Sequence, residues 1–516
     1  MTTTDSAAPG SRTYYGWQPE RVSFMFGMSG QRATMLAAGV LAAIMPLAVS
    51  HMADAVVTWP IAVLLTAMAF ARIAGRTVDE WLVAFVSFSI LRVRGQHKFI
   101  SGAFAPRAKT DPAGPVPMDL PGVLAPLKVL EADSGTGNGS SMAVIHHRHD
   151  RSYTAVARIR YPGIGLVDSS RRDQRVAGWG QLLSGLCSEG NPIIRVQALQ
   201  RIVPESGAAL RRWHTDHLSP DAPDAAKEIA STLLDSATLA TSQRESFLAF
   251  TLDERKAGSA IRGAGGGTAG AAAVLVRHLR ALTSSISAAD LTVDRWLDGR
   301  ELAEVIRTAF DPHSSRHLAD RRAATNMISN LTPALPGVDP ALAGPAAAQT
   351  AAGSYAHDGA LSVTYWVHSW PRNQVYSTCL GPLLGEGTHR RAFSLHMEPL
   401  GPRVAEREVM RERTARHVAI SMRRRTGQIV PEAEKEALRR AEAQDAERAA
   451  GHGLGRFSAY VTVTVTDPAE LEDACAGLEA DAAAARIEVR RMWLAQDVGF
   501  ALSALPVGMG LPRKRW

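Results

Sequence analysis

The sequence predicts an α+β protein in which an N-terminal two-helix transmembrane hairpin precedes cytoplasmic split, ferredoxin-like α+β modules. Two long uncharged runs lie close together between positions 33 and 71, whereas the rest of the chain mixes charged and apolar residues. Beyond position 127, short β-type runs alternate with helical periodicities. The chain has 516 residues, 46% hydrophobic and 21% charged, which is enough apolar material to bury a core.

The net charge and the cysteines limit the class of protein. The formal net charge of +7 is mild; it suits an anionic lipid surface or nucleic acid and identifies neither. Cys187, Cys379 and Cys475 lie far apart, and no pair has the spacing of a disulfide or zinc motif. We therefore expect a reducing, cytoplasmic environment for most of the chain.

The two uncharged runs predict membrane helices. No Asp, Glu, Lys or Arg occurs at positions 33–53 or, after Asp54, at positions 55–71. Because about 20 apolar residues cross a hydrocarbon layer, the first run is long enough and the second, with Pro60 near its start, is marginal. A cleaved signal peptide is an alternative for the first run, although polar residues precede it and an apolar run follows it. A buried core hairpin is the other alternative.

The flanking charges predict how the hairpin is oriented. Arg12, Arg21 and Arg32 precede the first run and further arginines follow the second, whereas the connection contains no Lys or Arg. The positive-inside rule then places both termini in the cytoplasm. Residues 78–91 carry apolar side chains at helical spacing and predict an amphipathic interfacial helix. The predicted membrane-interface residues are Trp59, Arg72, Arg76, Trp81, Arg92 and Arg94.

Changes in composition divide the chain into six predicted segments. Residues 104–126 are rich in Pro and Gly, and residues 311–353 are rich in Ala and Pro, which is typical of linkers. The segments are a cytoplasmic N-terminal segment (1–32), the transmembrane hairpin (33–72), an interfacial helix and linker (73–126), a first cytoplasmic α+β domain (127–310), a linker (311–353) and a second α+β domain with a charged helical arm (354–516).

Within the two α+β segments the residue patterns predict individual elements. The charged stretch 402–451 predicts helices broken at Pro431, and the strand–helix–strand pattern after it predicts a split, ferredoxin-like module. The expected strands are 142–148, 153–161, 192–203, 246–252, 361–370, 391–399, 457–466 and 486–494. The expected helices are 168–189, 205–217, 225–240, 271–285, 299–310 and 468–484.

Few residues suggest a site for chemistry. Gly265, Gly267 and Gly270 match G-x-G-x-x-G, but no strand leads directly into them and no Gly-Lys-Ser/Thr follows, so we interpret them as a loop before a helix. The histidines at 146, 147 and 149 lack the cysteines or carboxylates of a metal site, and we interpret them as surface or interface residues. The basic runs 423–425 and 513–515 suit phosphate, lipid, an acidic partner or plain solvation. We therefore predict no catalytic, cofactor-binding or metal-binding residues.

The layout and several short phrases resemble actinobacterial conjugation proteins whose genes accompany a type IV secretion-like ATPase. The hairpin followed by VDEWL (78–82) is similar to the small PrgI-type membrane proteins of conjugation systems. The cytoplasmic part resembles the N-terminal, non-motor region of conjugation ATPases. That likeness rests on YTAVARIR (153–160), VAGWG (176–180), YAHDGALSVTYW (355–366) and QDVGFALSALP (496–506).

The resemblance implies a structural and docking subunit of a conjugation or type IV secretion-like inner-membrane translocation apparatus, and not an enzyme. It implies membrane lipid, a conjugation-type ATPase and a multi-span channel protein as partners within a multi-subunit complex, with no cofactor of its own. Contact with nucleic acid stays open. The alternatives are a core membrane component of another secretion system such as type VII, or a membrane-bound enzyme with an unrecognised site.

Overall fold

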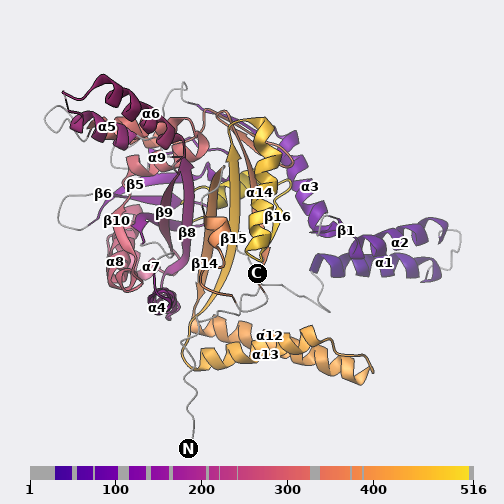
Figure 1. The fold of residues 1–516 in the computed structure, drawn as a ribbon. Coiled ribbons are helices and arrows are strands. Elements are labelled where there is room, and N and C mark those ends of the chain that lie inside the picture. Colours follow the sequence, from indigo (N-terminus) through magenta and orange to yellow (C-terminus); the bar gives the residue numbers. More distant parts are fainter. Residues whose placement is uncertain are drawn as a thin grey trace, which may run out of the picture.

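Figure 1 shows the computed structural model, in which a long sheet carries helices and two helical hairpins project from it. Helices and strands are mixed along the chain, which confirms the predicted α+β class. The structure describes residues 30–48, 55–73, 76–102, 116–134, 141–161, 167–204, 208–219, 221–240, 242–325, 337–371, 375–385 and 389–510. Most of the predicted N-terminal segment and the basic run 513–515 lie outside these ranges.

The first two helices, α1 (Gly30–Ala48) and α2 (Ala55–Phe70), form a hairpin that projects away from the sheet (Figure 1). Their backbones approach closely at Gly39, where an added Cβ atom would lie 3.0 Å from Thr66 Oγ1. Thr66 turns its hydroxyl inward and donates a hydrogen bond to Ala62 O. Within the described residues, no helix is both long enough and apolar enough to cross a membrane.

Two short paired strands and a helix connect this hairpin to the main sheet. Strands β1 (Arg72–Ile73) and β2 (Arg76–Thr77) pair with each other and precede α3 (Val78–Val93). Soon after α3, strand β3 (Lys98–Ile100) pairs with the main sheet. The segment 73–126, predicted as an interfacial helix and linker, therefore contributes two strands to the main sheet, β3 and β4 (Val116–Pro117).

Fourteen strands of the described chain join one sheet, and all the neighbouring pairs are antiparallel. The order is β3-β11-β12-β13-β15-β14-β8-β9-β7-β6-β5-β4, with β10 beside β7 and β16 beside β13. After β3 the strands are β4 (Val116–Pro117), β5 (Leu127–Asp133), β6 (Ser141–His147), β7 (Ser152–Arg160), β8 (Ile193–Pro204), β9 (Ser242–Asp253), β10 (Thr292–Trp296), β11 (Ala347–Thr350), β12 (Tyr355–His357), β13 (Ala360–Ser369), β14 (Arg390–Leu400), β15 (Leu454–Val465) and β16 (Glu488–Arg491).

The first half of the sheet contains a β–α–β–β–α–β unit. It consists of β7, α4 (Ser169–Leu186), β8, β9, α8 (Gly267–Ala288) and β10. Strand β9 lies between β7 and β8, and β7 lies between β9 and β10, so the order in space is β10-β7-β9-β8. The short α7 (Gly258–Gly263) precedes α8, and α9 (Gly299–Phe310) follows β10.

The second half repeats this connectivity. Its unit consists of β13, α11 (Gly381–Leu384), β14, β15, α14 (Leu471–Ala484) and β16, in the spatial order β16-β13-β15-β14. Helix α15 (Gln496–Ser503) follows β16 as α9 follows β10. The strand–helix–strand pattern expected near the end of the chain is present, with β13 inserted between its two parallel strands.

The two units share one sheet because β8 pairs with β14, with Val196 opposite Met397. The segment 311–353, predicted as a linker, contains α10 (Ser314–Thr325), the 3-10 helix η3 (Pro340–Leu342) and β11. Strand β11 pairs with both β3 and β12, and it buries alternate residues. Its Ala-rich composition is typical of a linker, but small alternating side chains also suit a strand at this position.

Helices cover both faces of the sheet. Helices α4 and α8 pack on one face of the sheet, and α11 and α14 pack on the same face further along. Met397 of β14 belongs to the first of these cores and Phe393 to the second, and residues four apart in a strand point to the same face. Helices α9 and α15 pack on the opposite face, where Phe310 and Phe500 lie 5.0 Å apart between ring centroids. This opposite face is a single core shared by both units.

The charged stretch forms a two-helix arm inserted between β14 and β15. Helix α12 (Pro402–Arg425) and helix α13 (Glu432–Ala449) lie side by side, as expected for a break at Pro431 (Figure 1). Ion pairs join Arg413 to Asp445 at 2.9 Å and Arg423 to Glu434 at 2.7 Å. The other expected helices are present as α5 (Ala208–His217) and α6 (Asp224–Ala240).

Candidate functional site

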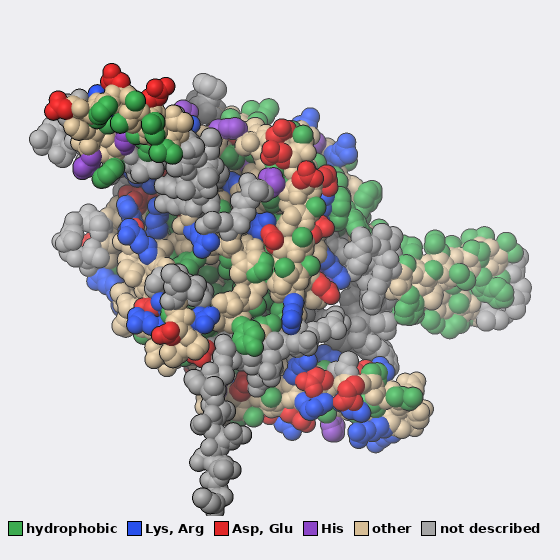
Figure 2. All heavy atoms as spheres, in the orientation of Figure 1, with side chains coloured by type: hydrophobic (Ala, Val, Ile, Leu, Met, Phe, Trp, Pro, Cys, Tyr) green, Lys and Arg blue, Asp and Glu red, His purple; other side chains and the backbone are tan. Residues whose placement is uncertain are grey.

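More than half of the exposed large apolar side chains of the described residues lie on the three N-terminal helices, and the others are spread over the rest of the chain. Figure 2 shows the projecting hairpin as a largely apolar surface beside a body of mixed charge. Proteins that expose apolar patches of this extent generally cover them with lipid or another protein. The exposed side chains on these helices are Val40, Leu41, Ile44, Met45, Val56, Val57, Trp59, Ile61, Val63, Leu64, Phe70, Leu82, Val83, Phe85, Val86, Ile90 and Val93.

The predicted membrane-interface residues lie on or between α2 and α3. Trp59 is 51% exposed on α2. Arg92 and Arg94 are exposed at the end of α3, and Trp81 is half-buried in its first turn. Arg72 and Arg76 lie in the β1–β2 ladder; the structure describes their backbone and not their side chains. Five of the six residues therefore flank α3 or the turn before it.

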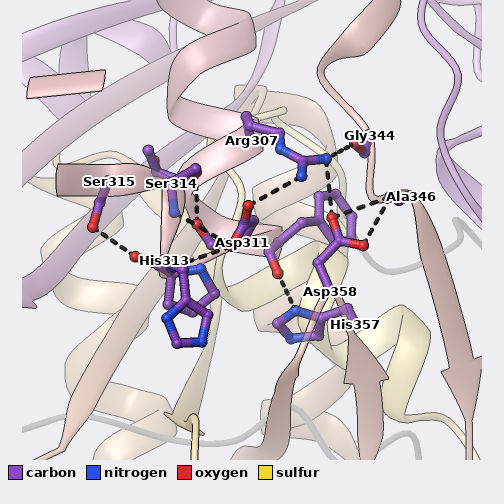
Figure 3. Close-up of polar contacts among 12 residues, drawn as sticks. Arg307, Asp311, His313, Ser314, Ser315, Gly344, Ala346, His357 and Asp358 are labelled. Atoms are coloured by element: carbon purple, nitrogen blue, oxygen red, sulfur yellow. Dashed lines mark hydrogen bonds and ion pairs between the residues drawn. The ribbon is translucent and has the colours of Figure 1, made fainter. Parts of the chain in front are cut away.

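A polar network joins α9 to segments that are distant in the sequence (Figure 3). Arg307 lies 3.1 Å from Asp311 Oδ2 and 2.9 Å from Asp358 Oδ2, and it donates a hydrogen bond to Gly344 O. Asp358, in the turn between β12 and β13, accepts a hydrogen bond from the backbone N–H of Ala346. Because these groups pair with one another, we interpret the network as a structural joint.

His357 lies beside this network and contacts a serine, which raises the question of a nucleophile and its base. Its Nδ1 atom donates to Phe310 O, and its Nε2 atom lies 2.8 Å from Ser362 Oγ. Burial lowers the pKa of His357 to about 4, so the ring is neutral at pH 7. Ser362 is fully buried and also contacts Thr464 Oγ1 at 2.8 Å. A substrate cannot reach this serine, so the contact is structural.

An arginine-lined cavity lies where the two units meet. It is partly open and has a volume of about 20 Å³, which is room for a group the size of one water. The ends of β8 and β15, the start of β14 and the helices α9 and α15 form its walls. The lining residues are Arg201, Val203, Thr308, Ala309, Arg390, Arg391, Ala392, Thr464 and Ala504.

Two of these arginines pair with carboxylates. Arg201 lies 2.5 Å from Glu245 Oε2, and Arg391 lies 2.7 Å from Asp481 Oδ2. Arg201 also donates to Val305 O near the end of α9. Burial alone would raise the pKa of Glu245, but the nearby arginines outweigh it and hold this pKa below its ordinary value.

Arg390 has no carboxylate partner among the residues that the structure describes. Its Nη1 atom donates to Thr308 O at 2.8 Å. Burial, reinforced by Arg201, lowers the pKa of Arg390 to about 10, so the guanidinium remains charged at neutral pH. The Nε atoms of Arg201, Arg390 and Arg391 are buried and have no hydrogen-bond partner. The cluster therefore holds cationic donors that the described protein groups do not use.

The glycine-rich loop lacks the context of a dinucleotide-binding site. It connects α7 to α8, so a helix rather than a strand precedes it. Gly265 and Gly267 have φ angles of 95° and 62°, which glycine adopts readily. At Gly270 a Cβ atom would lie 2.8 Å from Ile261 O, so this glycine allows two helices to pack closely.

The histidines near the β6–β7 turn and the three cysteines also have structural surroundings. His146 stacks on Tyr153 with ring centroids 4.6 Å apart, and His147 lies 3.4 Å from Asp150. Burial lowers the pKa of both histidines. All three cysteines are free. Across the described ranges, no cluster of His, Cys, Asp and Glu is arranged to hold a metal ion.

Reasoning from the sequence missed the arginine cluster. Arg390 and Arg391 are the first two residues of β14, which was expected as the strand 391–399. Because arginine is seldom buried, arginines at the start of a strand did not indicate a buried site. The only signal was the pair of adjacent arginines before an apolar run. Comparison with known proteins adds no assignment: no protein-family model and no curated protein matches this chain.

Proposed function

We propose that this protein is a structural and docking subunit of a conjugation or type IV secretion-like inner-membrane translocation apparatus, and that it anchors a partner ATPase. The observation that carries the proposal is the apolar surface of α1, α2 and α3 beside a large body of mixed charge. The resemblance of the sequence to conjugation proteins supplies the kind of apparatus.

The hairpin and α3 supply the membrane contact in this proposal. Helix α2 and all of α1 beyond Arg32 lie within the uncharged runs 33–53 and 55–71, and leucine, valine and isoleucine make up most of their exposed large apolar side chains. Helix α3 carries exposed Phe85 and Val93, and Arg92 and Arg94 flank Val93 at its end, which suits the boundary between acyl chains and anionic headgroups. The hairpin enters the bilayer, and both termini face the cytoplasm.

The connection between α3 and the sheet supports a body held close to the bilayer. Strand β3 begins at Lys98, soon after α3 ends at Val93, and pairs with β11. His97 O also accepts a hydrogen bond from Thr350 N at 2.8 Å. A long linker would let the body move away from its anchor, whereas this short connection fixes the distance between them.

The two β–α–β–β–α–β units support the interpretation as split, ferredoxin-like modules and supply surfaces for a partner. Strands β10 and β16 lie off the main strand path, at positions where a chain from another protein can add backbone hydrogen bonds. The charged α12–α13 arm offers side chains of both signs, which fix the orientation of a partner more than its affinity.

Truncation tests the proposal. A chain ending after Arg94 should remain in the membrane, release the ATPase to the soluble fraction and abolish transfer. The matched variant lacks residues 33–72 and keeps the body; it should leave the membrane and retain the ATPase. Fractionation followed by co-purification measures both outcomes. If the ATPase stays membrane-bound and transfer continues with the stub alone, the docking role is wrong.

A further inference from the structure

We propose that the arginine cluster binds a phosphate-type oxyanion at the junction of the two units. The inference does not depend on the membrane role. It rests on the cavity of about 20 Å³ and on the side chains of Arg201, Arg390 and Arg391 that line it.

The balance of charge around the cavity favours an anion. Arg158 lies 3.5 Å from Glu245, which also pairs with Arg201, so two guanidinium groups share one carboxylate. Asp481 pairs with Arg391, and Arg390 has only a carbonyl partner in the described structure. Glu245 and Asp311 act on Arg390 through space without a direct ion pair, and an anion in the cavity supplies a direct partner for this buried charge.

The geometry of the donors favours an oxyanion over a halide. A guanidinium presents its Nε and Nη groups along one planar edge, which matches two oxygens of a phosphoryl group. Arg201 on β8 and Arg390 and Arg391 on β14 line one small cavity, and the Nε atom of each is buried without a hydrogen-bond partner. The cavity admits about one oxygen-sized group, so the remaining oxygens lie toward its opening.

Capping of α9 is the alternative explanation for the same arginines. Arg201 donates to Val305 O in the middle of α9, and Arg390 donates to Thr308 O in its last turn. If capping were their whole role, removing Arg390 would destabilise the fold equally with or without an anion. If the cluster binds an oxyanion, the effect of the substitution depends on phosphate.

Thermal unfolding and calorimetry of the full chain in mild detergent distinguish the two. At constant ionic strength, inorganic phosphate should raise the unfolding temperature above its value in chloride, with a dissociation constant of about 1 mM or lower. Arg390→Met should abolish this shift, and Arg390→Lys should weaken binding roughly tenfold because it keeps the charge and loses the planar edge. The control Arg403→Gln removes an arginine that is 84% exposed on α12 and should keep the full shift.

ATP without magnesium is the second ligand to be tested in the same way. If phosphate raises the unfolding temperature and ATP does not, the ligand is a free oxyanion. If both raise it and the increase depends on Arg390, the site binds the phosphoryl group of a larger molecule. Two results overturn the proposal: no shift with phosphate at about 10 mM, ten times the expected dissociation constant, or a full shift retained in Arg390→Met. If Arg390→Met does not fold, Arg390→Lys and Arg403→Gln still decide the question.

Discussion

Two buried histidines hold the helices of the shared core to the sheet. His357 donates to Phe310 O at the end of α9, and His396 donates from Nε2 to Leu502 O in α15 at 2.8 Å. Burial lowers the pKa of both histidines to about 4. Each ring is therefore neutral in the folded protein across the range in which an exposed histidine takes up a proton.

These histidines predict acid sensitivity. Below the ordinary histidine pKa of 6.5, the unfolded chain binds protons that the folded chain excludes until about pH 4. The free energy of unfolding should therefore fall as the pH falls through this window, by up to about 1.4 kcal/mol per pH unit for each histidine. Urea unfolding at pH 7.0, 6.0 and 5.0 measures the slope.

Substitution assigns that slope to the two residues. His396→Gln keeps a donor for Leu502 O and has no proton to bind, so its stability should vary less with pH than that of the native chain. The exposed His452 provides the control, and His452→Gln should leave the slope unchanged. An unchanged slope in His396→Gln would contradict the assignment.

At the residue level, the structure shows which side chains are exposed and which pair. Trp59, Arg92 and Arg94 are exposed, and their place at a membrane interface stays a prediction. The arginine cluster could not be predicted, because Arg391 meets Asp481 and Arg201 meets Glu245 only after the sheet has formed. No local pattern encodes such pairs.

Among the elements, the α12–α13 arm differs from the others because the two strands that flank it pair up to the residues where the arm begins and ends. Leu400, the last residue of β14, pairs directly with Leu454, the first residue of β15. Only the base of α12 is buried against the body, at Ala405 and Val409. In the rest of the arm Ile420 on α12 and Ala441 on α13 are buried, and most other side chains are exposed and joined by ion pairs that contribute little to stability.

Shortening the arm tests its role. Replacing residues 415–443 with a glycine-rich turn keeps the base and the ion pair between Arg413 and Asp445. The unfolding temperature should change little, because few buried contacts are removed, whereas co-purification of the ATPase should weaken. A large loss of thermal stability would show that the arm supports the fold, and undiminished co-purification would exclude it from docking.

Elements were predicted well where one periodicity dominates. The helix Gly299–Phe310 has the expected ends, since Asp298 caps it and Phe310 ends its apolar face. Composition gave a wrong prediction where small residues dominate: Ala347–Thr350, within the predicted linker 311–353, forms a strand. Alanine and glycine have weak intrinsic signals for a strand, so tertiary pairing decides their structure.

For the whole molecule, the proposed membrane anchor determines where the chain ends lie. The connection between α1 and α2 contains His51 and Asp54 but no Lys or Arg, whereas arginines flank both helices. A reporter enzyme fused after Trp516 should be active only as a cytoplasmic marker. Fusion within the connection, after Ala53, is the matched control and should give the opposite result. Activity of a periplasmic reporter at Trp516 would contradict the orientation.

The order of strands across the whole sheet could not be read from the sequence. Local patterns predicted β8 and β14 as strands, but their pairing joins Val196 to Met397 across half of the chain. Antiparallel pairs this distant depend on the shapes of both units and on the shared core between α9 and α15. The α+β class was therefore predictable, and the single continuous sheet was not.

The repeated connectivity of the two units extends to the way they pair. Strands β8 and β14 hold the same place in their units, and they lie antiparallel to each other at the centre of the sheet. Identical edge strands pair in this way across the two-fold axis of a homodimer. Two copies of one self-pairing unit joined in tandem have this arrangement. The arm between β14 and β15 has a positional counterpart in α5 and α6, which lie between β8 and β9 in the first unit.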